Sequence, residues 1–157
     1  MNAEKLALAA KKATHIIAHT PTEQKDRALL ALGHLIGEKK AYLILENKKD
    51  LEAAGNAGLA KSLIDRLRID DKVISEMQAS IRDVVSLADP VGEIIKIWKR
   101  PNGLQVGRMR IPIGVILIIY ESRPNVTIEA FSLCLKSGNC AILKGGSEAH
   151  HSNMALY

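Results

Sequence analysis

The chain has 157 residues, of which 47% are hydrophobic, 25% charged and 3% aromatic. This is the composition of an ordinary globular protein, and it excludes the fibrous and disordered classes. The first residues contain no apolar run of the signal-peptide kind. The longest uncharged apolar run, Ile111–Tyr120, is far shorter than the ~20 residues that a membrane helix needs. We therefore expect a cytoplasmic protein with no membrane partner.

The net charge of +5 is unevenly distributed along the chain. Up to Pro90 there are 14 basic and 13 acidic side chains, whereas from Val91 onward there are 8 and 4. A local positive excess suits a small anionic ligand, such as a phosphorylated substrate or cofactor. We do not expect nucleic acid as a partner, because the chain lacks the basic clusters and aromatic platforms that such binding uses.

The first 90 residues are expected to form helices. Apolar residues recur at steps of three and four in four successive runs, which is the pattern of helices that bury one face. Pro21, followed by Thr22 and Glu23, resembles a helix start, and Gly55 and Gly58 mark a helix exit. The expected helices cover residues 6–17, 21–36, 42–51 and 70–85.

After Pro90 the pattern changes to that of strands. Residues 93–99 and 104–111 are rich in β-forming side chains, and they flank the turn sequence Arg100-Pro101-Asn102-Gly103. Proline presets one turn angle and Asn-Gly favours positive φ, so this segment predicts a β-hairpin.

Two further runs predict buried parallel strands. Residues 114–120 are apolar at every position, as is typical of a strand covered on both faces, and residues 140–143 form a second short apolar run. Residues 127–136, between them, have helical spacing, so the order is β-α-β with a right-handed crossover. Two strands are fewer than the ~4–6 of a usual sheet. We therefore expect the sequence to stop inside a larger domain.

The loop after the first buried strand is a candidate site. It reads Glu121-Ser122-Arg123-Pro124-Asn125 and lies at the carboxyl end of the strand, where open α/β sheets bind ligands. Its acid, hydroxyl, guanidinium and carboxamide offer a proton donor or acceptor and donors for an oxyanion. A surface loop with a helix cap would contain the same residues, and composition alone leaves both interpretations open.

The loop after the second strand is the other candidate. It reads Lys144-Gly145-Gly146-Ser147-Glu148. Glycines let the backbone approach a ligand closely, and the amino-terminal end of a following helix favours phosphate. The sequence matches neither of the common phosphate-loop patterns. A glycine-rich turn with a serine cap and no ligand therefore stays an open alternative.

No metal site is expected. His150 and His151 point to different faces of a helix and have no ligand partner at helical spacing. The two cysteines, Cys134 and Cys140, lack CxxC spacing and lie in apolar segments, so we interpret both as small core residues in a reducing environment.

Four segments together carry a family resemblance. They cover residues 100–115, 120–127, 133–139 and 143–149. With the helical start, they closely resemble the gamma-glutamyl phosphate reductase family, also called glutamate-5-semialdehyde dehydrogenases, within the aldehyde dehydrogenase-like superfamily. The resemblance covers essentially the whole chain but only the amino-terminal portion of the family's sequence.

The resemblance implies a truncated α/β fold of the aldehyde dehydrogenase kind. Residues 1–90 would be the helical part of the cofactor domain, and residues 91–111 a β-hairpin. Residues 112–157 would be the first β-α-β-α unit of an NADP-binding, Rossmann-like sheet. The catalytic and substrate domain would lie outside these 157 residues.

The resemblance also implies an activity. The family reduces L-glutamyl 5-phosphate to L-glutamate 5-semialdehyde with NADPH, in proline biosynthesis. A cysteine attacks the acyl phosphate, phosphate leaves, and hydride reduces the resulting thioester. That cysteine lies in the later portion of the family's sequence, so the resemblance implies that these 157 residues alone are inactive. A homo-oligomeric full-length protein is also implied.

Site residues follow from the resemblance by position. Lys144 would contact the cofactor's adenosine ribose or its 2′-phosphate, with Gly145, Gly146, Ser147 and Glu148 beside it. The superfamily usually places an acidic residue three positions after that lysine, where this chain has Ser147.

The preceding loop would face the substrate. Glu121, Ser122 and Arg123 would line the substrate side, and Asn125 would be the oxyanion donor.

Two alternatives to this function stay open. One is a non-catalytic piece that acts only through association, because two apolar strands leave an exposed sheet edge. The other is a related acylating aldehyde dehydrogenase with a different substrate.

Overall fold

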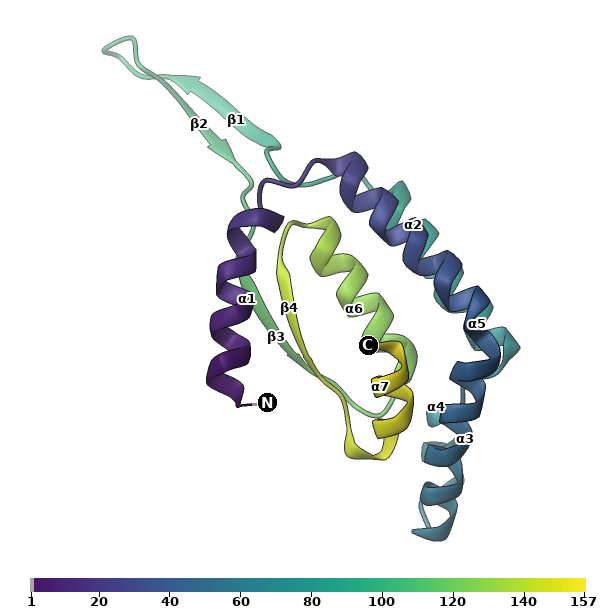
Figure 1. Ribbon diagram of the computed structural model, residues 1–157. Helices are drawn as coiled ribbons and strands as arrows, with labels where there is room; N and C mark the ends of the chain where they lie inside the picture. The colour runs from purple at the N-terminus through teal and green to yellow at the C-terminus, as the bar shows by residue number, and fades with distance from the viewer. Residues whose placement is uncertain (1) are drawn as a thin grey trace.

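The computed structural model describes residues 2–157, as seven α-helices, four strands and one short 3₁₀ helix (Figure 1). Their order is five helices, a hairpin, and then a β-α-β-α unit. The helices are α1 (Ala3–Ile17), α2 (Thr22–Glu38), α3 (Lys40–Asn56), α4 (Lys61–Leu67), α5 (Asp71–Ser86), α6 (Pro124–Lys136) and α7 (His150–Leu156). The strands are β1 (Ile94–Lys99), β2 (Gln105–Met109), β3 (Val115–Ile119) and β4 (Cys140–Lys144), and the 3₁₀ helix η1 is Ser147–Ala149.

The main core lies between α2, α3, α5 and α6. Helix α5 begins where the Asp70 side chain accepts a hydrogen bond from the Val73 amide at 3.0 Å, which is a typical N-cap. Its buried face packs against α2, and residues of α3 and α6 complete the cluster. The fully buried members are Leu29, Ile36, Leu43, Ile69, Ile74, Met77, Ile81, Val84 and Ile128. The helical periodicity of residues 21–85 is thus confirmed as the signal of this core, whereas α1 has no fully buried residue and packs on the β3-β4 sheet instead.

Helix α4 was not expected from the sequence. It has only seven residues, too few to show a hydrophobic period. Its last residue, Leu67, is 1% exposed and packs with Ala54 of α3 and Ala149 of η1. The helix exists because this tertiary contact buries its end, which no local pattern reveals.

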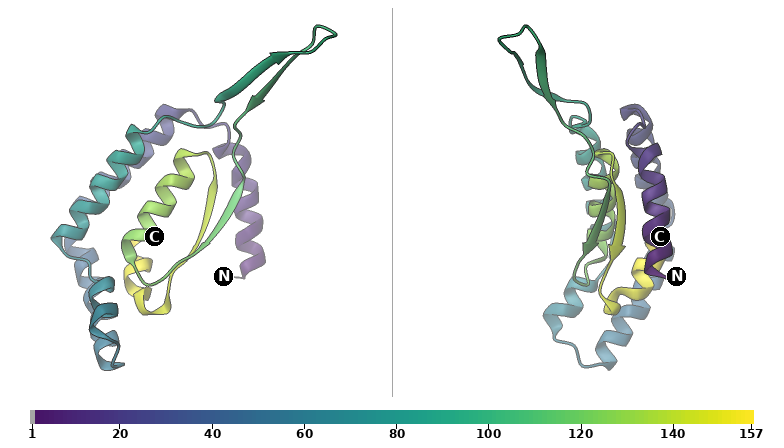
Figure 2. Two further views of the ribbon diagram at one scale, coloured as in Figure 1. Left: turned by 180° about the vertical axis from the view of Figure 1, so that it is seen from behind. Right: turned by 90° about the vertical axis from the view of Figure 1, so that its left-hand side faces the viewer.

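The predicted hairpin is confirmed. Strands β1 and β2 pair antiparallel, with Lys99 opposite Gln105 at the turn. The turn closes with hydrogen bonds from the Arg100 amide to the Leu104 carbonyl and from the Gly103 amide to the Arg100 carbonyl, and Gly103 has a φ of 88°. The hairpin extends away from the rest of the molecule (Figures 1 and 2). Its apolar side chains are correspondingly exposed, for example Ile97 at 59%.

The β-α-β unit is confirmed as well. Strands β3 and β4 pair in parallel from Val115 opposite Cys140 to Ile119 opposite Lys144, and α6 connects them. Helix α1 lies on one face of this sheet and α6 on the other (Figures 1 and 2). Helix α6 begins at Pro124, three residues before the expected start, because proline at the first helical position gives up no hydrogen bond.

Four charged side chains join the helical part to α6. The Lys25 ammonium is 1% exposed, pairs with Asp89 and donates to the Lys136 carbonyl at 3.0 Å. The Lys136 ammonium in turn donates to Asp26 at 2.6 Å and to the Val85 carbonyl at 2.9 Å. Each buried ammonium therefore has a carboxylate and a carbonyl as partners, which is the condition for a charge to be tolerated in a protein interior. We call Lys25, Asp26, Asp89 and Lys136 the lysine-aspartate cluster.

We expect Asp89 to make stability sensitive to acid. Burial by itself raises the pKa of Asp89, but hydrogen bonds from Lys25, Thr22 and the Val91 amide, with the Lys25 charge, hold that pKa below its ordinary value of 3.8. A carboxyl with a lowered folded-state pKa stabilises the fold above its unfolded pKa, and this contribution is lost as the pH falls through the folded value.

Urea unfolding at about pH 5 and at about pH 3 measures this effect. We expect the free energy of unfolding to fall between the two conditions, and Asp89→Asn to show a smaller fall. An equal fall in the variant and the parent chain would assign the acid sensitivity to other carboxyls.

Candidate functional site

The two loops predicted from the sequence lie side by side. Because β3 and β4 are parallel and Ile119 is opposite Lys144, both loops leave the same edge of the sheet. The Ser122 hydroxyl donates a hydrogen bond of 2.6 Å to the Glu148 carboxylate and so joins the loops directly. The fold therefore places residues 121–123 next to residues 146–148.

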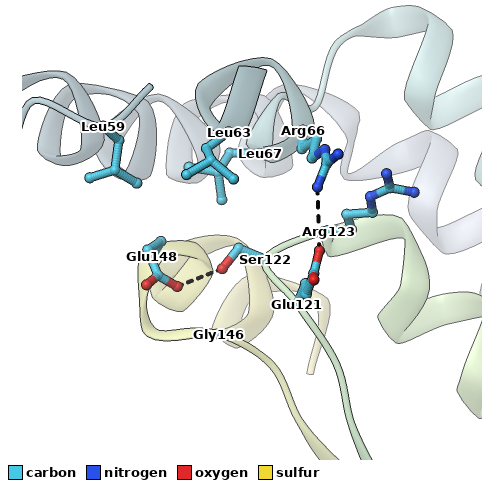
Figure 3. A pocket seen from close by; sticks show the side chains of 9 residues that line it. All are labelled: Leu59, Leu63, Arg66, Leu67, Glu121, Ser122, Arg123, Gly146 and Glu148. Atoms are coloured by element: carbon cyan, nitrogen blue, oxygen red, sulfur yellow. Dashed lines mark hydrogen bonds and ion pairs between the residues drawn. The ribbon is translucent and has the colours of Figure 1, made fainter. Parts of the chain in front are cut away.

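A pocket of about 290 Å³ lies between these loops and the α4 region (Figure 3). Its walls come from three parts of the chain that are distant in sequence. The lining residues are Leu59, Leu63, Arg66 and Leu67 on one side, and Glu121, Ser122, Arg123, Gly146 and Glu148 on the other. The sequence does not predict the α4 wall, because nothing in it connects a short helix near residue 64 to loops that follow more than 50 residues later.

Arg66 and Arg123 supply the positive charge of the pocket. The Arg66 side chain extends toward the Glu121 carboxylate, whereas the Arg123 side chain extends past Glu121 and away from the rest of the lining (Figure 3). Arg66 is 3.4 Å from the Glu121 carboxylate, and these side chains are 47% and 81% exposed. An exposed pair at this distance is weak, about 0–1 kcal/mol, so a charged ligand can replace Glu121 at Arg66 or Arg66 at Glu121.

Gly145 and Gly146 have a structural reason to be glycine. A Cβ on Gly146 would collide with the Ser122 hydroxyl and lie 2.6 Å from the Glu148 carboxylate. A Cβ on Gly145 would collide with the Asn153 amide and lie 3.1 Å from the Tyr120 hydroxyl. The close approach that the sequence suggested for a ligand is thus made by side chains of this chain.

The first amides of α7 are also occupied by a side chain of this chain. The amides of His151 and Ser152 donate to the Asp50 carboxylate at 3.0 and 2.7 Å, and the Ser152 hydroxyl donates to it at 2.6 Å. Asp50 is 3% exposed, so α3 caps this helix from inside the protein. The expectation that the helix start receives a phosphate is therefore wrong for these two amides.

Asn47 extends this connection to α4. Its amide donates to the Leu67 carbonyl at 2.7 Å and to the Ser152 hydroxyl at 2.9 Å, and its oxygen accepts from the Ile69 amide at 2.8 Å. Asn47 and Asp50 thus hold the α4 wall and the glycine loop to the same helix. Neither residue was singled out from the sequence, where a polar residue in a helix looks like part of a solvated face.

The remaining cofactor-side residues are exposed. Lys144 lies at the end of β4, and no carboxylate among residues 2–157 pairs with its ammonium. Ser147 begins η1 and is exposed as well. Lys144 is therefore accessible to an anionic ligand, as a contact to ribose or phosphate requires.

Asn125 lies apart from the pocket lining. It is in the first turn of α6, and its amide donates to Glu129 one turn later at 3.2 Å. The expected loop position is thus a helical one, so its amide points along α6.

The cysteines lie away from the pocket. Cys134 is buried in α6, and Cys140 begins β4, at the opposite end of the strand from Gly146. Burial raises the pKa of both thiols, and for Cys134 the neighbouring Cys140 adds to the rise. A thiol with a raised pKa is protonated at neutral pH and is a poor nucleophile.

Within residues 2–157 no three histidine, cysteine or acidic side chains lie close enough together to hold a metal ion. None of the helices in this part of the chain is both long and apolar enough to cross a membrane.

We expect Ser122→Ala to raise the pKa of Glu148. The Ser122 hydrogen bond is the main reason that this pKa lies below its ordinary value of 4.5, with smaller contributions from the Glu148 amide and Ser147. An NMR titration of the side-chain carboxyl carbon measures the change. Ser75→Ala is the control, because that hydroxyl donates to the Asp71 carbonyl within α5. An unchanged Glu148 titration in Ser122→Ala would show that the two loops are not joined in solution.

Two curated proteins similar to this chain carry the same name. A protein of Sulfurihydrogenibium is 56% identical over 154 residues, or 98% of this chain, and one of Clostridium botulinum is 51% identical over 147 residues. Both are named gamma-glutamyl phosphate reductase. The chain is similar to the amino-terminal portion of gamma-glutamyl phosphate reductase. It spans about a third of the length of these relatives, 34% and 36%.

Solved gamma-glutamyl phosphate reductases have the same fold in the matched part. The Thermotoga maritima structure superposes with a TM-score of 0.91 at 43% identity, over 94% of this chain and 36% of that one. The Saccharomyces cerevisiae structure gives 0.92 at 34% identity, over 99% and 40%. No family model matches the chain. The predicted fold class, a helical start followed by a hairpin and the beginning of a parallel sheet, is thus confirmed.

Proposed function

We propose that this chain is the amino-terminal part of a cytoplasmic reductase that converts L-glutamyl 5-phosphate to L-glutamate 5-semialdehyde with NADPH. Phosphate is released, and the reaction passes through a thioester on a cysteine outside the 157 residues. The observation that carries this proposal is the similarity to gamma-glutamyl phosphate reductases along nearly the whole chain, at 56% identity in one relative.

The same proposal divides the chain by role. Residues 1–90 support the cofactor domain, residues 91–111 form the hairpin, and residues 112–157 begin the NADP-binding sheet. Full-length copies are proposed to assemble into a homo-oligomer.

On the cofactor side, Lys144 fits the proposed role best. It is exposed, it lies at the carboxyl end of a parallel strand, and its ammonium suits the ribose or the 2′-phosphate of NADPH. Ser147 adds an exposed hydroxyl next to it. The shape of the loop is fixed by its neighbours. Gly145 lies against Asn153, and Gly146 and Glu148 lie against Ser122. NADPH, when bound, supplies the hydride.

On the substrate side, we propose Glu121, Ser122 and Arg123, which line the pocket. Asn125 remains a proposed oxyanion donor, and reaching a reacting carbonyl requires its amide to leave Glu129. Neither Cys134 nor Cys140 is proposed as the nucleophile, because both thiols have a raised pKa and lie away from the pocket.

The reverse reaction tests this proposal. Purified protein of verified intact mass is incubated with glutamate 5-semialdehyde, NADP⁺ and phosphate, and NADPH formation is followed by absorbance. We expect no turnover from the 157-residue chain and phosphate-dependent turnover from a full-length protein that contains it. Turnover by a protein of 17.1 kDa would overturn the assignment of the nucleophile and return Cys134 and Cys140 to consideration.

A further inference from the structure

The pocket beside α4 contains opposite charges in equal number. Arg66 and Arg123 contribute two positive charges, and Glu121 and Glu148 contribute two negative ones. Its volume of about 290 Å³ is close to the lower limit of small-molecule pockets, ~300–1,000 Å³. The pocket therefore suits a compact ligand that carries both signs of charge, and it is small for a dinucleotide.

The two guanidinium groups have donors available for such a ligand. Arg66 directs one nitrogen at Glu121 over 3.4 Å, whereas strong charge-assisted hydrogen bonds measure ~2.7–2.9 Å. The Arg123 side chain has no hydrogen-bond partner among residues 2–157, although it is charged and lies in the same pocket. Because a guanidinium carries five N–H groups, Arg66 can hold a carboxylate, and Arg123 can add a second contact when its side chain turns toward Glu121.

The two carboxylates have different surroundings. Glu148 already accepts the Ser122 hydrogen bond, and this bond holds its pKa below the ordinary value. Glu121 is 81% exposed, and its only ion pair among the described residues is the long one to Arg66. A phosphate dianion entering here would face two negative side chains, whereas a zwitterion would place a cation against Glu121.

We propose that this pocket binds the α-amino-acid end of the substrate. Arg66 holds the α-carboxylate, Arg123 turns in to contact it from the other loop, and Glu121 holds the α-ammonium. Leu63 and Leu67 line the opposite wall, where the methylene groups of the substrate pass (Figure 3). The inference rests on the proposed function, because a glutamyl group activated at its γ-carboxyl keeps both α-groups charged.

Arg66 is therefore a specificity residue that lies outside both loops identified from the sequence. It belongs to α4, more than 50 positions before Glu121, and reaches the pocket because α4 packs beside the sheet edge. With the α-groups held here, the phosphorylated end of the substrate extends out of the pocket.

Titrations of the ¹⁵N-labelled 157-residue chain test this inference by NMR. The probes are L-glutamine, which has the zwitterionic head and an uncharged side chain, glutaramate, which lacks the α-ammonium, and inorganic phosphate. We expect L-glutamine to shift the arginine side-chain signals and to bind about tenfold more tightly than glutaramate. Arg66→Gln is expected to weaken binding of both organic probes about tenfold.

Two further variants sharpen the result. Glu121→Gln is expected to weaken L-glutamine but not glutaramate, because only L-glutamine carries the ammonium. Arg82→Gln, an exposed arginine on α5, is expected to change neither. Three outcomes would each overturn the inference. They are phosphate binding as tight as that of L-glutamine, no L-glutamine binding by the unsubstituted chain, and an Arg66→Gln variant that behaves like Arg82→Gln.

A separate NADP⁺ titration distinguishes this inference from the proposed function. NADP⁺ is followed by the amides of Lys144 and Gly145, which do not line the pocket. Shifts there without any response to L-glutamine would overturn the amino-acid site and support the cofactor role. A response to L-glutamine without NADP⁺ shifts would support the amino-acid site and overturn the cofactor role.

Discussion

Replacing Lys25 by methionine is expected to lower the free energy of unfolding by about 3–5 kcal/mol. The substitution removes an ammonium that is 1% exposed and leaves the Asp89 carboxylate, which is 12% exposed, without its cation. It also leaves the Lys136 carbonyl without its donor. The cost arises chiefly from the uncompensated buried charge, because methionine fills a similar volume. Urea unfolding followed by circular dichroism measures the change.

Two comparisons make this prediction specific. Lys72→Met, at a lysine that is 82% exposed on α5, is expected to change stability by less than about 0.5 kcal/mol. The double variant Lys25→Met/Asp89→Asn is expected to recover part of the loss, because it leaves no unpaired charge. A Lys25→Met variant as stable as Lys72→Met would show that the Lys25–Asp89 pair contributes nothing to the stability of the fold.

Replacing Asp50 by alanine is expected to lower the free energy of unfolding by about 3 kcal/mol or more. The carboxylate accepts three hydrogen bonds at the start of α7, and hydrogen bonds to a charged group are worth about 1.5–3 kcal/mol each before the structure relaxes. Alanine leaves the His151 and Ser152 amides without acceptors in a part-buried site. The glycine loop before α7 is then less firmly held, so its amides are expected to exchange hydrogen faster.

Unfolding and hydrogen exchange together test the role of Asp50. Glu52→Ala on the same helix is the matched control, because Glu52 is 64% exposed and its pair with Lys48 is long at 3.8 Å. We expect that control to stay within about 0.5 kcal/mol of the parent chain. Faster exchange at Gly145 and Gly146 in both variants would mean that Asp50 has no particular part in holding the loop.

Most of the fold could be predicted from the sequence because its signals are local. The apolar period of α2 and α5, the Asn-Gly turn of the hairpin and the isoleucine-rich β3 each indicate their own element. Helix α4 could not be predicted, because seven residues show no period and its stability comes from contacts with α3 and η1. The early start of α6 was missed because Pro124 reads as a loop residue unless it occupies the first helical position.

The candidate site was predictable in part for the same reason. Two polar loops after parallel strands must meet at one sheet edge, and the Ser122 to Glu148 hydrogen bond shows that they do. Arg66 could not be found, because its place in the pocket depends on how α4 packs. The buried roles of Asn47 and Asp50 were equally hidden, since only tertiary structure distinguishes a polar side chain facing the core from one facing solvent.

The lysine-aspartate cluster determines the order in which parts of the protein can complete their packing during synthesis. Its partners are 110 and 111 positions apart, because the Lys136 ammonium meets Asp26 and the Lys25 ammonium meets the Lys136 carbonyl. Pairings between distant parts of a chain form late, after the closure of a long loop. Helices α2 and α5 can associate as soon as both have left the ribosome, yet Asp26 lacks its ammonium and Lys25 one of its two acceptors until α6 follows. A nascent chain paused before residue 136 should therefore keep these helices in a looser, more protease-sensitive state than the finished chain.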